Sequence, residues 1–137
     1  MTHTSAPQQA GVRLRSAVPT FLVADVARTA QWYAENLGFH TAGSAPKQQP
    51  YVYASLMRGP VEIMLLSLAD YEKPDLRDRR TGGLWDAYIR VDGVHALYET
   101  VDGKPFVQMP LRRQAYGDWE FEVRDPNGYI LVFGGGY

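Results

Sequence analysis

Two stretches near opposite ends of the chain decide the fold: Asp25-Val26-Ala27-Arg28-Thr29-Ala30-Gln31-Trp32-Tyr33, continued by Asn36-Leu37-Gly38-Phe39, and Asp125-Pro126-Asn127-Gly128-Tyr129-Ile130-Leu131-Val132-Phe133-Gly134. The first stretch predicts a helix, because Asp25 can cap it and apolar residues recur at spacings of three and four from Val26 to Leu37. Gly38 can adopt the positive φ that ends such a helix. The second stretch begins with a strong tight-turn signal and therefore predicts a hairpin whose second strand follows Gly128.

Strands are predicted around this helix wherever a short apolar run is bounded by turn residues. In the first half the predicted strands cover residues 18–24, 39–43, 51–57 and 61–68. The second half repeats the order, with a strand at 84–91, a helix at 92–101, and further strands at 104–109, 112–115 with 119–123, and 129–133. The junction Val23-Ala24-Asp25-Val26 aligns with Arg90-Val91-Asp92-Gly93. A repeat of about 65 residues is too long for a solenoid unit.

We therefore predict an α+β fold in a single domain of residues 16–137, made of two βαβββ modules at about 17–68 and 83–134. A charged linker at 69–81 joins the modules and has room for one helical turn. Residues 1–15 lack periodicity and are predicted to be a flexible tail. Each amphipathic helix covers one face of a curved, mixed sheet. The opposite, concave face is then a cup that is available to a ligand.

The composition excludes several classes of function. The chain has 137 residues, of which 45% are hydrophobic, and this suits one domain with a real core. A net charge of −1 gives no field that would favour nucleic acid or an anionic membrane. The absence of cysteine excludes disulfides, thiolate metal sites and cysteine nucleophiles. No apolar run approaches the roughly 20 residues that span a bilayer, and none has signal-peptide character, so we expect a cytoplasmic protein.

Together with Tyr116-Gly117-Asp118-Trp119-Glu120-Phe121, the two stretches resemble the vicinal oxygen chelate superfamily, which includes glyoxalase I, extradiol dioxygenases and the bleomycin resistance proteins. The resemblance covers about residues 17–135. It implies the glyoxalase/bleomycin resistance fold and, in the enzymes, a divalent metal held by one ligand from each of four strands. The four corresponding positions in this chain are Val18, Met64, Asp86 and Val132.

These four side chains do not suit a metal ion. Valine has no lone pair, and methionine sulfur is too soft for Mg, Mn, Fe or Ni. Only Asp86 is a suitable ligand, whereas a catalytic site needs about three protein ligands. We therefore predict no metal, no cofactor and no catalytic residue, and we favour a binding protein over an enzyme. The alternative is a lyase, isomerase or dioxygenase with a displaced metal site, in which Glu62 joins Asp86 because Glu62 and Met64 share one side of their strand.

Metal-free members of the superfamily, such as the bleomycin resistance proteins, are homodimers that trap a drug without modifying it. The resemblance therefore implies an antibiotic-resistance role for this chain, in which a homodimer sequesters a small, planar aromatic drug. Because side chains alternate along a strand, Tyr88 and Arg90 share the cup side of Asp86. The predicted ligand-binding residues are Tyr53, Glu62, Met64, Asp86, Tyr88, Arg90, Trp119 and Val132. A third interpretation, an accessory dimer whose cup is packed core, stays open.

Overall fold

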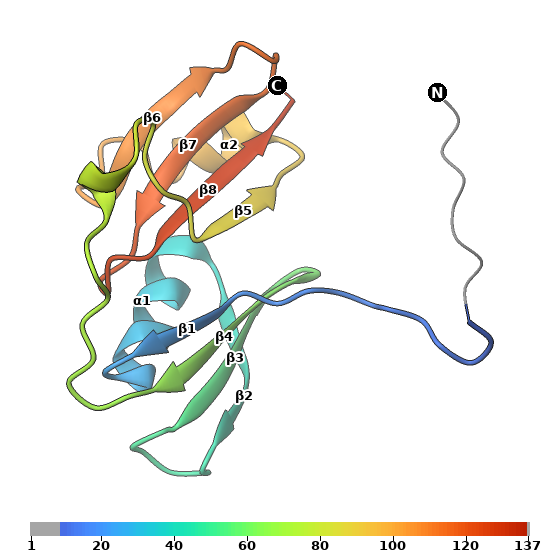
Figure 1. Cartoon of the computed structure of the whole chain (residues 1–137), viewed down its shortest axis with the longest axis vertical. Helices are drawn as coiled ribbons and strands as arrows, with labels where there is room; N and C mark the ends of the chain where they lie inside the picture. Colours follow the sequence, from blue (N-terminus) through green and yellow to red (C-terminus); the bar gives the residue numbers. More distant parts are fainter. Residues whose placement is uncertain (1–8, 137) are drawn as a thin grey trace.

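The computed structural model describes residues 9–136, so residues 1–8 of the predicted tail and Tyr137 lie outside the described residues. The described chain forms two four-stranded mixed sheets, each accompanied by one α-helix, and the predicted α+β fold is confirmed. Figure 1 shows the two sheets in separate halves of the molecule, joined by a linker. Within the described residues, no helix has the length and apolar character that a membrane crossing requires.

The first module contains β1 (Thr20–Val23), α1 (Val26–Leu37), β2 (His40–Ala45), β3 (Tyr53–Arg58) and β4 (Val61–Ser67). Its sheet has the order β1-β4-β3-β2, with β1 parallel to β4 and the other pairs antiparallel. Helix α1 begins and ends as predicted. Asp25 Oδ1 accepts a hydrogen bond from the backbone N–H of Arg28 at 3.0 Å, and Gly38 adopts a φ of 70° at the carboxyl end.

The linker contains one 3₁₀ turn, η1 (Arg77–Arg79), and leads to the second module. This module contains β5 (Ala87–Arg90), α2 (Val94–Glu99), β6 (Val107–Arg113), β7 (Trp119–Arg124) and β8 (Ile130–Gly135). Its sheet order, β5-β8-β7-β6, repeats the topology of the first sheet. The registers also correspond, since Thr20 lies opposite Met64 in one parallel pair and Tyr88 opposite Val132 in the other. Positions in the two modules can therefore be compared one by one.

Strand β6 differs from its prediction. Parts of the segments predicted separately at 104–109 and 112–115 form one strand that passes through Pro110, with one register shift before the proline and a second across it. This is possible because β6 is an edge strand, in which the missing N–H of a proline need not break a ladder. Helix α2 is also shorter than predicted, because it starts at Val94 after Gly93 has taken a φ of 80°.

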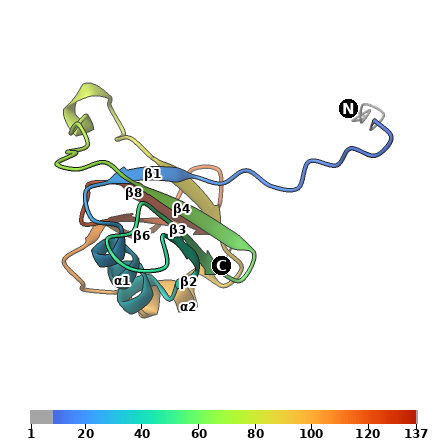
Figure 2. The same cartoon turned by 90° about the horizontal axis from the view of Figure 1, so that it is seen from below.

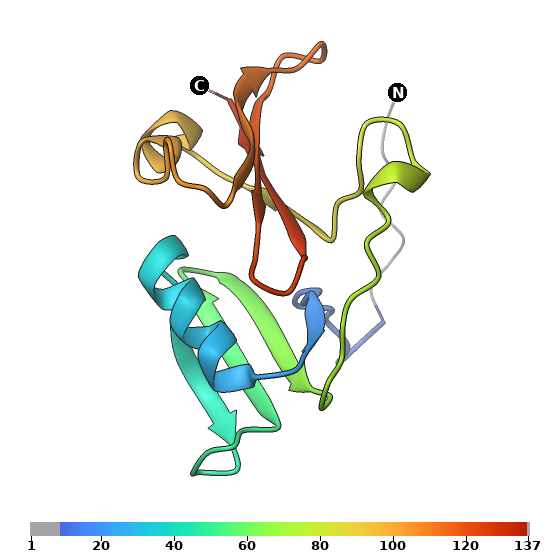
Figure 3. The same ribbon diagram turned by 90° about the vertical axis from the view of Figure 1, so that its left-hand side faces the viewer.

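Both helices lie on one side of the sheets, and the linker with η1 lies on the other side (Figures 2 and 3). The side chains that face the helices form the core. On β4 these are Ile63 and Leu65, and on β8 they are Leu131 and Phe133, all of them buried. The helix side of each sheet is therefore committed to packing, which leaves the opposite side for other roles.

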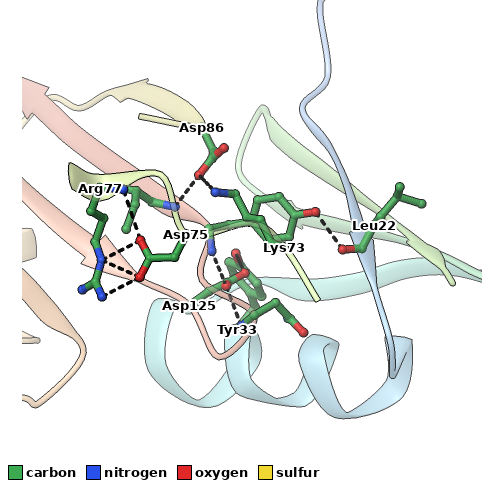
Figure 4. Close-up of polar contacts among 10 residues, drawn as sticks. Leu22, Tyr33, Lys73, Asp75, Arg77, Asp86 and Asp125 are labelled. Atoms are coloured by element: carbon green, nitrogen blue, oxygen red, sulfur yellow. Dashed lines mark hydrogen bonds and ion pairs between the residues drawn. The ribbon is translucent and has the colours of Figure 1, made fainter. Parts of the chain in front are cut away.

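The two modules are joined through the stretches that first indicated the fold. The buried hydroxyl of Tyr33 on α1 donates a hydrogen bond of 2.7 Å to Oδ2 of Asp125, at the turn between β7 and β8 (Figure 4). The other oxygen of Asp125 accepts the backbone N–H groups of Asn127 and Tyr129 at 2.8 and 2.9 Å. Burial, followed by the nearby Asp125 charge, raises the pKa of Tyr33 well above its ordinary value. Tyr33 therefore stays a proton donor at neutral pH.

Tyr129 adds a second connection between the modules. Its hydroxyl donates a hydrogen bond of 2.7 Å to the backbone carbonyl of Leu22 on β1 (Figure 4). Its ring stacks on Phe21, with 4.1 Å between ring centroids. The turn between β7 and β8 thus fastens the second sheet to both β1 and α1.

Candidate functional site

A cleft of about 570 Å³ opens between the two modules, beside the edge strand β5. The segment before β1 and the start of β4 form one wall, and β5 forms the other. We call it the β5 cleft, and its lining includes Val18, Glu62, Asp86, Tyr88 and Arg90. Its size lies within the range that is usual for small-molecule sites, about 300–1,000 Å³.

Four of the predicted ligand-binding residues meet in the β5 cleft: Glu62, Asp86, Tyr88 and Arg90. The guanidinium carbon of Arg90 lies 5.5 Å from the centroid of the Tyr88 ring. Trp85 approaches the same ring, at 5.6 Å between centroids and an interplanar angle of 47°. The cleft thus presents aromatic surface between two carboxylates and a guanidinium.

The other predicted residues do not line the β5 cleft. Met64 on β4 and Tyr53 on β3 are half-buried residues of the first sheet, on the side of that sheet that faces away from the core. Val132 is fully buried on β8. The Trp119 ring lies 4.7 Å from the ring of His95, which belongs to α2, and is therefore on the helix side of the second sheet.

Asp86 has structural partners of its own. Its Oδ2 accepts a hydrogen bond of 2.8 Å from the backbone N–H of Ile130 and lies 3.5 Å from Nζ of Lys73 in the linker (Figure 4). The backbone N–H of Asp86 donates in turn to the carbonyl of Ile130 at 2.8 Å. Asp86 therefore closes the end of the β5–β8 ladder, and part of its charge is balanced by the linker lysine.

The residues present do not fit the divalent metal that the resemblance implies for enzymes. Val18 and Val132 offer no electron pair, and Met64 offers only a thioether. Oε2 of Glu62 accepts a 2.6 Å hydrogen bond from Ser55 Oγ. Residues 9–136 contain no group of three or more His, Cys, Asp and Glu side chains placed to hold an ion. We therefore assign no chemical step to a metal.

Sequence reasoning missed two carboxylates on the concave face of the second sheet. Glu120 and Glu122 on β7 are only 4% and 7% exposed. The hydroxyls of Tyr88 and Tyr116 both donate to Oε2 of Glu120, the first at 2.6 Å, and Gln108 Nε2 donates to Glu122 at 3.1 Å. In the described part of the chain, no lysine or arginine forms an ion pair with either glutamate. Their spacing of two in an otherwise apolar strand was the signal that could have revealed them.

Gly134 makes room for this arrangement. A Cβ at Gly134 would collide with the hydroxyl of Tyr88 and would lie only 2.7 Å from its Cζ and 3.0 Å from Glu120 Cγ. Burial, and then the bond to Glu120, raises the pKa of Tyr88. The bond to Glu120 is the main cause that raises the pKa of Tyr116 to about 12. Both hydroxyls thus remain donors at neutral pH and hold Glu120 as the acceptor.

Comparison with known proteins gives the family and the fold. The model of the Glyoxalase/Bleomycin resistance protein/Dioxygenase superfamily matches residues 15–133. A search of curated proteins found no match.

Three solved structures with different descriptions are similar to this chain in fold. TioX from Micromonospora sp. ML1 is 18% identical, with a TM-score of 0.69 over 88% of this chain and 97% of its own. A glyoxalase-related enzyme from Clostridium phytofermentans is 16% identical, with a TM-score of 0.70 over 94% and 100%. The bleomycin-binding protein of Streptomyces verticillus, solved with copper(II)-bleomycin, is 21% identical, with a TM-score of 0.64 over 92% and 99%. At these identities the likeness establishes the fold alone.

Proposed function

Because the chain belongs to the Glyoxalase/Bleomycin resistance protein/Dioxygenase superfamily, we propose that it is a cytoplasmic homodimer that sequesters a small, planar aromatic molecule without a metal. One observation carries the proposal. The cleft between the modules is large enough for a ligand and lined by recognition groups, while the positions that would hold a metal carry too few donors. An antibiotic is the leading class of ligand, since solved structures of this fold include a bleomycin-binding protein.

The aromatic part of the cleft supports a flat ligand. The Tyr88 ring lines the cleft, so a bound molecule can contact it. Trp85 is outside the lining but packs beside that ring and is 47% exposed. Stacking on such a ring contributes about 0.5–1.5 kcal/mol beyond the burial of area. Glu62 would orient a ligand that carries a positive group. Ser55 bonds only Oε2 of Glu62, so the second carboxylate oxygen can contact that group.

Exposed apolar surface supports the dimer. Before β1 the described chain leaves the body as an extended segment (Figure 1). Leu14 precedes β1 and is 94% exposed. On the concave side of the first sheet, Leu22 and Leu66 are 37% and 40% exposed. Leu22 and Leu66 are paired in the register of β1 and β4, and adjacent exposed apolar side chains are typical of an interaction site. A second copy of the chain is the occupant we propose.

Ligand-dependent stabilisation tests the sequestration. A panel containing bleomycin and planar aromatic antibiotics, with and without a cationic amine, would be screened by thermal unfolding. A true ligand stabilises the folded protein by RT ln(1 + [L]/Kd), about 2.7 kcal/mol at a hundredfold excess over Kd. Tyr88→Ala should remove the shift and Tyr88→Phe should retain most of it, because only the first loses the ring. Leu76→Ala in the linker, outside the cleft, is the matched control.

The superfamily enzymes provide the second candidate function. Glu62 and Asp86 line the same cleft, so a displaced metal site in a lyase, isomerase or dioxygenase would have to use this pair. Elemental analysis of protein purified without chelator separates the two candidates. About one equivalent of transition metal that is lost in Glu62→Gln would support the enzyme and contradict sequestration.

A further inference from the structure

A second cavity, of about 610 Å³, lies between the modules on the side of α2. It shares Pro60, Val61 and Arg90 with the β5 cleft but opens beyond them, toward the end of β5 and α2. Its apolar lining includes Phe39, Val61, Ile89 and Phe133, and two arginines, Arg58 and Arg90, also line it. We propose that this α2-side cavity binds a small organic anion, whose acidic group is held by the two arginines and whose apolar body lies on the aromatic and aliphatic lining.

Arg58 is held in place before any ligand arrives. Its Nη1 donates a hydrogen bond of 2.9 Å to the backbone carbonyl of Leu37, at the end of α1. The guanidinium packs against Gly38, where a Cβ would lie 3.2 Å from Nη1 and 3.4 Å from Cζ. The glycine that ends the helix thus also makes room for the guanidinium. An arginine that is already ordered loses less side-chain entropy when it binds a carboxylate, and this favours affinity.

Arg90 approaches from the other module. It ends β5, and its guanidinium carbon lies 5.5 Å from the centroid of the Tyr88 ring, which leaves its N–H groups available at the edges. In residues 9–136 the ion pairs found are Lys73–Asp86 and Arg77–Asp75, so neither Arg58 nor Arg90 is neutralised by a carboxylate. Asp92 is the acidic residue of the lining.

The charges of the lining select the class of ligand. Two arginines against one aspartate leave this cavity with a net positive charge. Planar guanidinium groups match carboxylate, phosphate and sulfonate oxygens with paired N–H donors. The apolar lining favours an anion with an aromatic or branched aliphatic body over a bare inorganic ion. This inference does not depend on what the β5 cleft binds.

A fluorescent anion tests the proposal on the full-length chain. The probe is 8-anilinonaphthalene-1-sulfonate, and the matched neutral probe is N-phenyl-1-naphthylamine, which has the same rings without the sulfonate. We expect Arg58→Gln and Arg90→Gln to raise the Kd of the sulfonate probe at least tenfold while changing that of the neutral probe less than twofold. Arg79→Gln, in η1, should change neither, and rising salt should weaken only the anionic probe.

Two further variants show whether a loss of probe binding comes from the anion site or from misfolding. Ala96→Trp fills the cavity from α2 and leaves both arginines in place, so it should abolish the arginine-dependent binding of the sulfonate probe without removing a charge. Glu72→Gln, in the linker and outside the lining of both cavities, should leave both affinities unchanged. Circular dichroism and thermal unfolding check that each variant is folded. If the Arg58→Gln and Ala96→Trp variants are folded and bind the sulfonate probe as tightly as the unchanged protein does, the proposal of an anion site in this cavity is contradicted.

Discussion

In the first module the concave face of the sheet carries partly exposed leucines together with the carboxylate of Glu62, whereas in the second it holds two buried glutamates, Glu120 and Glu122. By strand register, Thr20 of the first module corresponds to Tyr88 of the second, Tyr53 to Glu120, and Leu66 to Gly134. This register differs by one residue from the sequence alignment, because Leu22 and not Val23 corresponds to Arg90. The helix-facing residues do not diverge in this way, since both modules have buried apolar side chains there. The difference shows that packing against a helix restricts one face of each sheet, while the other face is able to take up different tasks.

The largest expected effect on the free energy of unfolding comes from replacing Gly134 of the second module by leucine, the residue at the equivalent position of the first module. Gly134→Leu places a side chain where the Tyr88 hydroxyl and Glu120 lie, so the free energy of unfolding in urea should fall by about 3 kcal/mol, the cost of overpacking a buried site. The reciprocal change, Leu66→Gly, should cost about 1 kcal/mol because Leu66 is partly exposed. The double variant Tyr88→Ala, Gly134→Leu should recover part of the loss. Equal losses for the two glycine–leucine exchanges would contradict the comparison.

A smaller effect is expected where the two modules are joined. Tyr33→Phe leaves the buried Asp125 carboxylate without its side-chain donor, so unfolding should become easier by about 2 kcal/mol. Tyr129→Phe removes a hydrogen bond to the neutral carbonyl of Leu22 and should cost about 1 kcal/mol. Urea unfolding of both variants measures the ranking. A larger loss for Tyr129→Phe would mean that the bond between α1 and the β7–β8 turn is not the main polar connection.

The pH dependence follows from the same tyrosines. Burial is the main cause that raises the pKa of Tyr33, of Tyr88 and of Tyr129, the last to about 12. The hydrogen bond to Glu120 raises the pKa of Tyr116 to about 12 as well. Unfolded tyrosines ionise near pH 10, so between about pH 10 and 12 the unfolded chain releases protons that the folded chain keeps. The free energy of unfolding should therefore be unaffected by these groups below pH 10 and fall as the pH rises above it. Urea unfolding from pH 8 to 11.5 measures this fall, and Tyr33→Phe should reduce its slope.

The smallest effect on stability is expected at the exposed segment. Leu14→Asp should change the free energy of unfolding by less than about 0.5 kcal/mol, because the side chain has few contacts within one chain. If a second copy covers this segment, the same change should shift the protein from dimer to monomer in size-exclusion chromatography with light scattering. Leu76→Asp, at an exposed leucine of the linker, is the control. A dimer that persists in Leu14→Asp would show that the segment is not part of the interface.

Local patterns predicted the fold well. The cap at Asp25, the stop at Gly38 and the turn after Asp125 are determined by neighbouring residues, and the structure has all three. Strand alternation also placed Tyr88 and Arg90 on one side of β5, where they reach the cleft together. These features depend on backbone geometry that a few adjacent residues specify.

The chemistry of the site was harder to predict. Asp86 was predicted as a ligand-binding residue, but its Oδ2 accepts a hydrogen bond from the amide of Ile130, which is 44 positions away in the chain. Glu120 is bonded by Tyr88, 32 positions away, and both depend on the missing side chain of Gly134. Such partners meet only after β5, β7 and β8 have come together. The residue pattern of a single strand therefore cannot predict these contacts.

The hydrogen bond between Tyr33 and Asp125 has a consequence for how relatives of this protein are sorted. The two stretches by which the chain is recognised hold its halves together, and neither supplies a group to the β5 cleft. A relative can therefore keep both stretches while carrying different groups in the cleft. To assign an activity to a newly sequenced relative, the residues on β5 and β7 must be compared, because the two fold-defining stretches indicate only the fold.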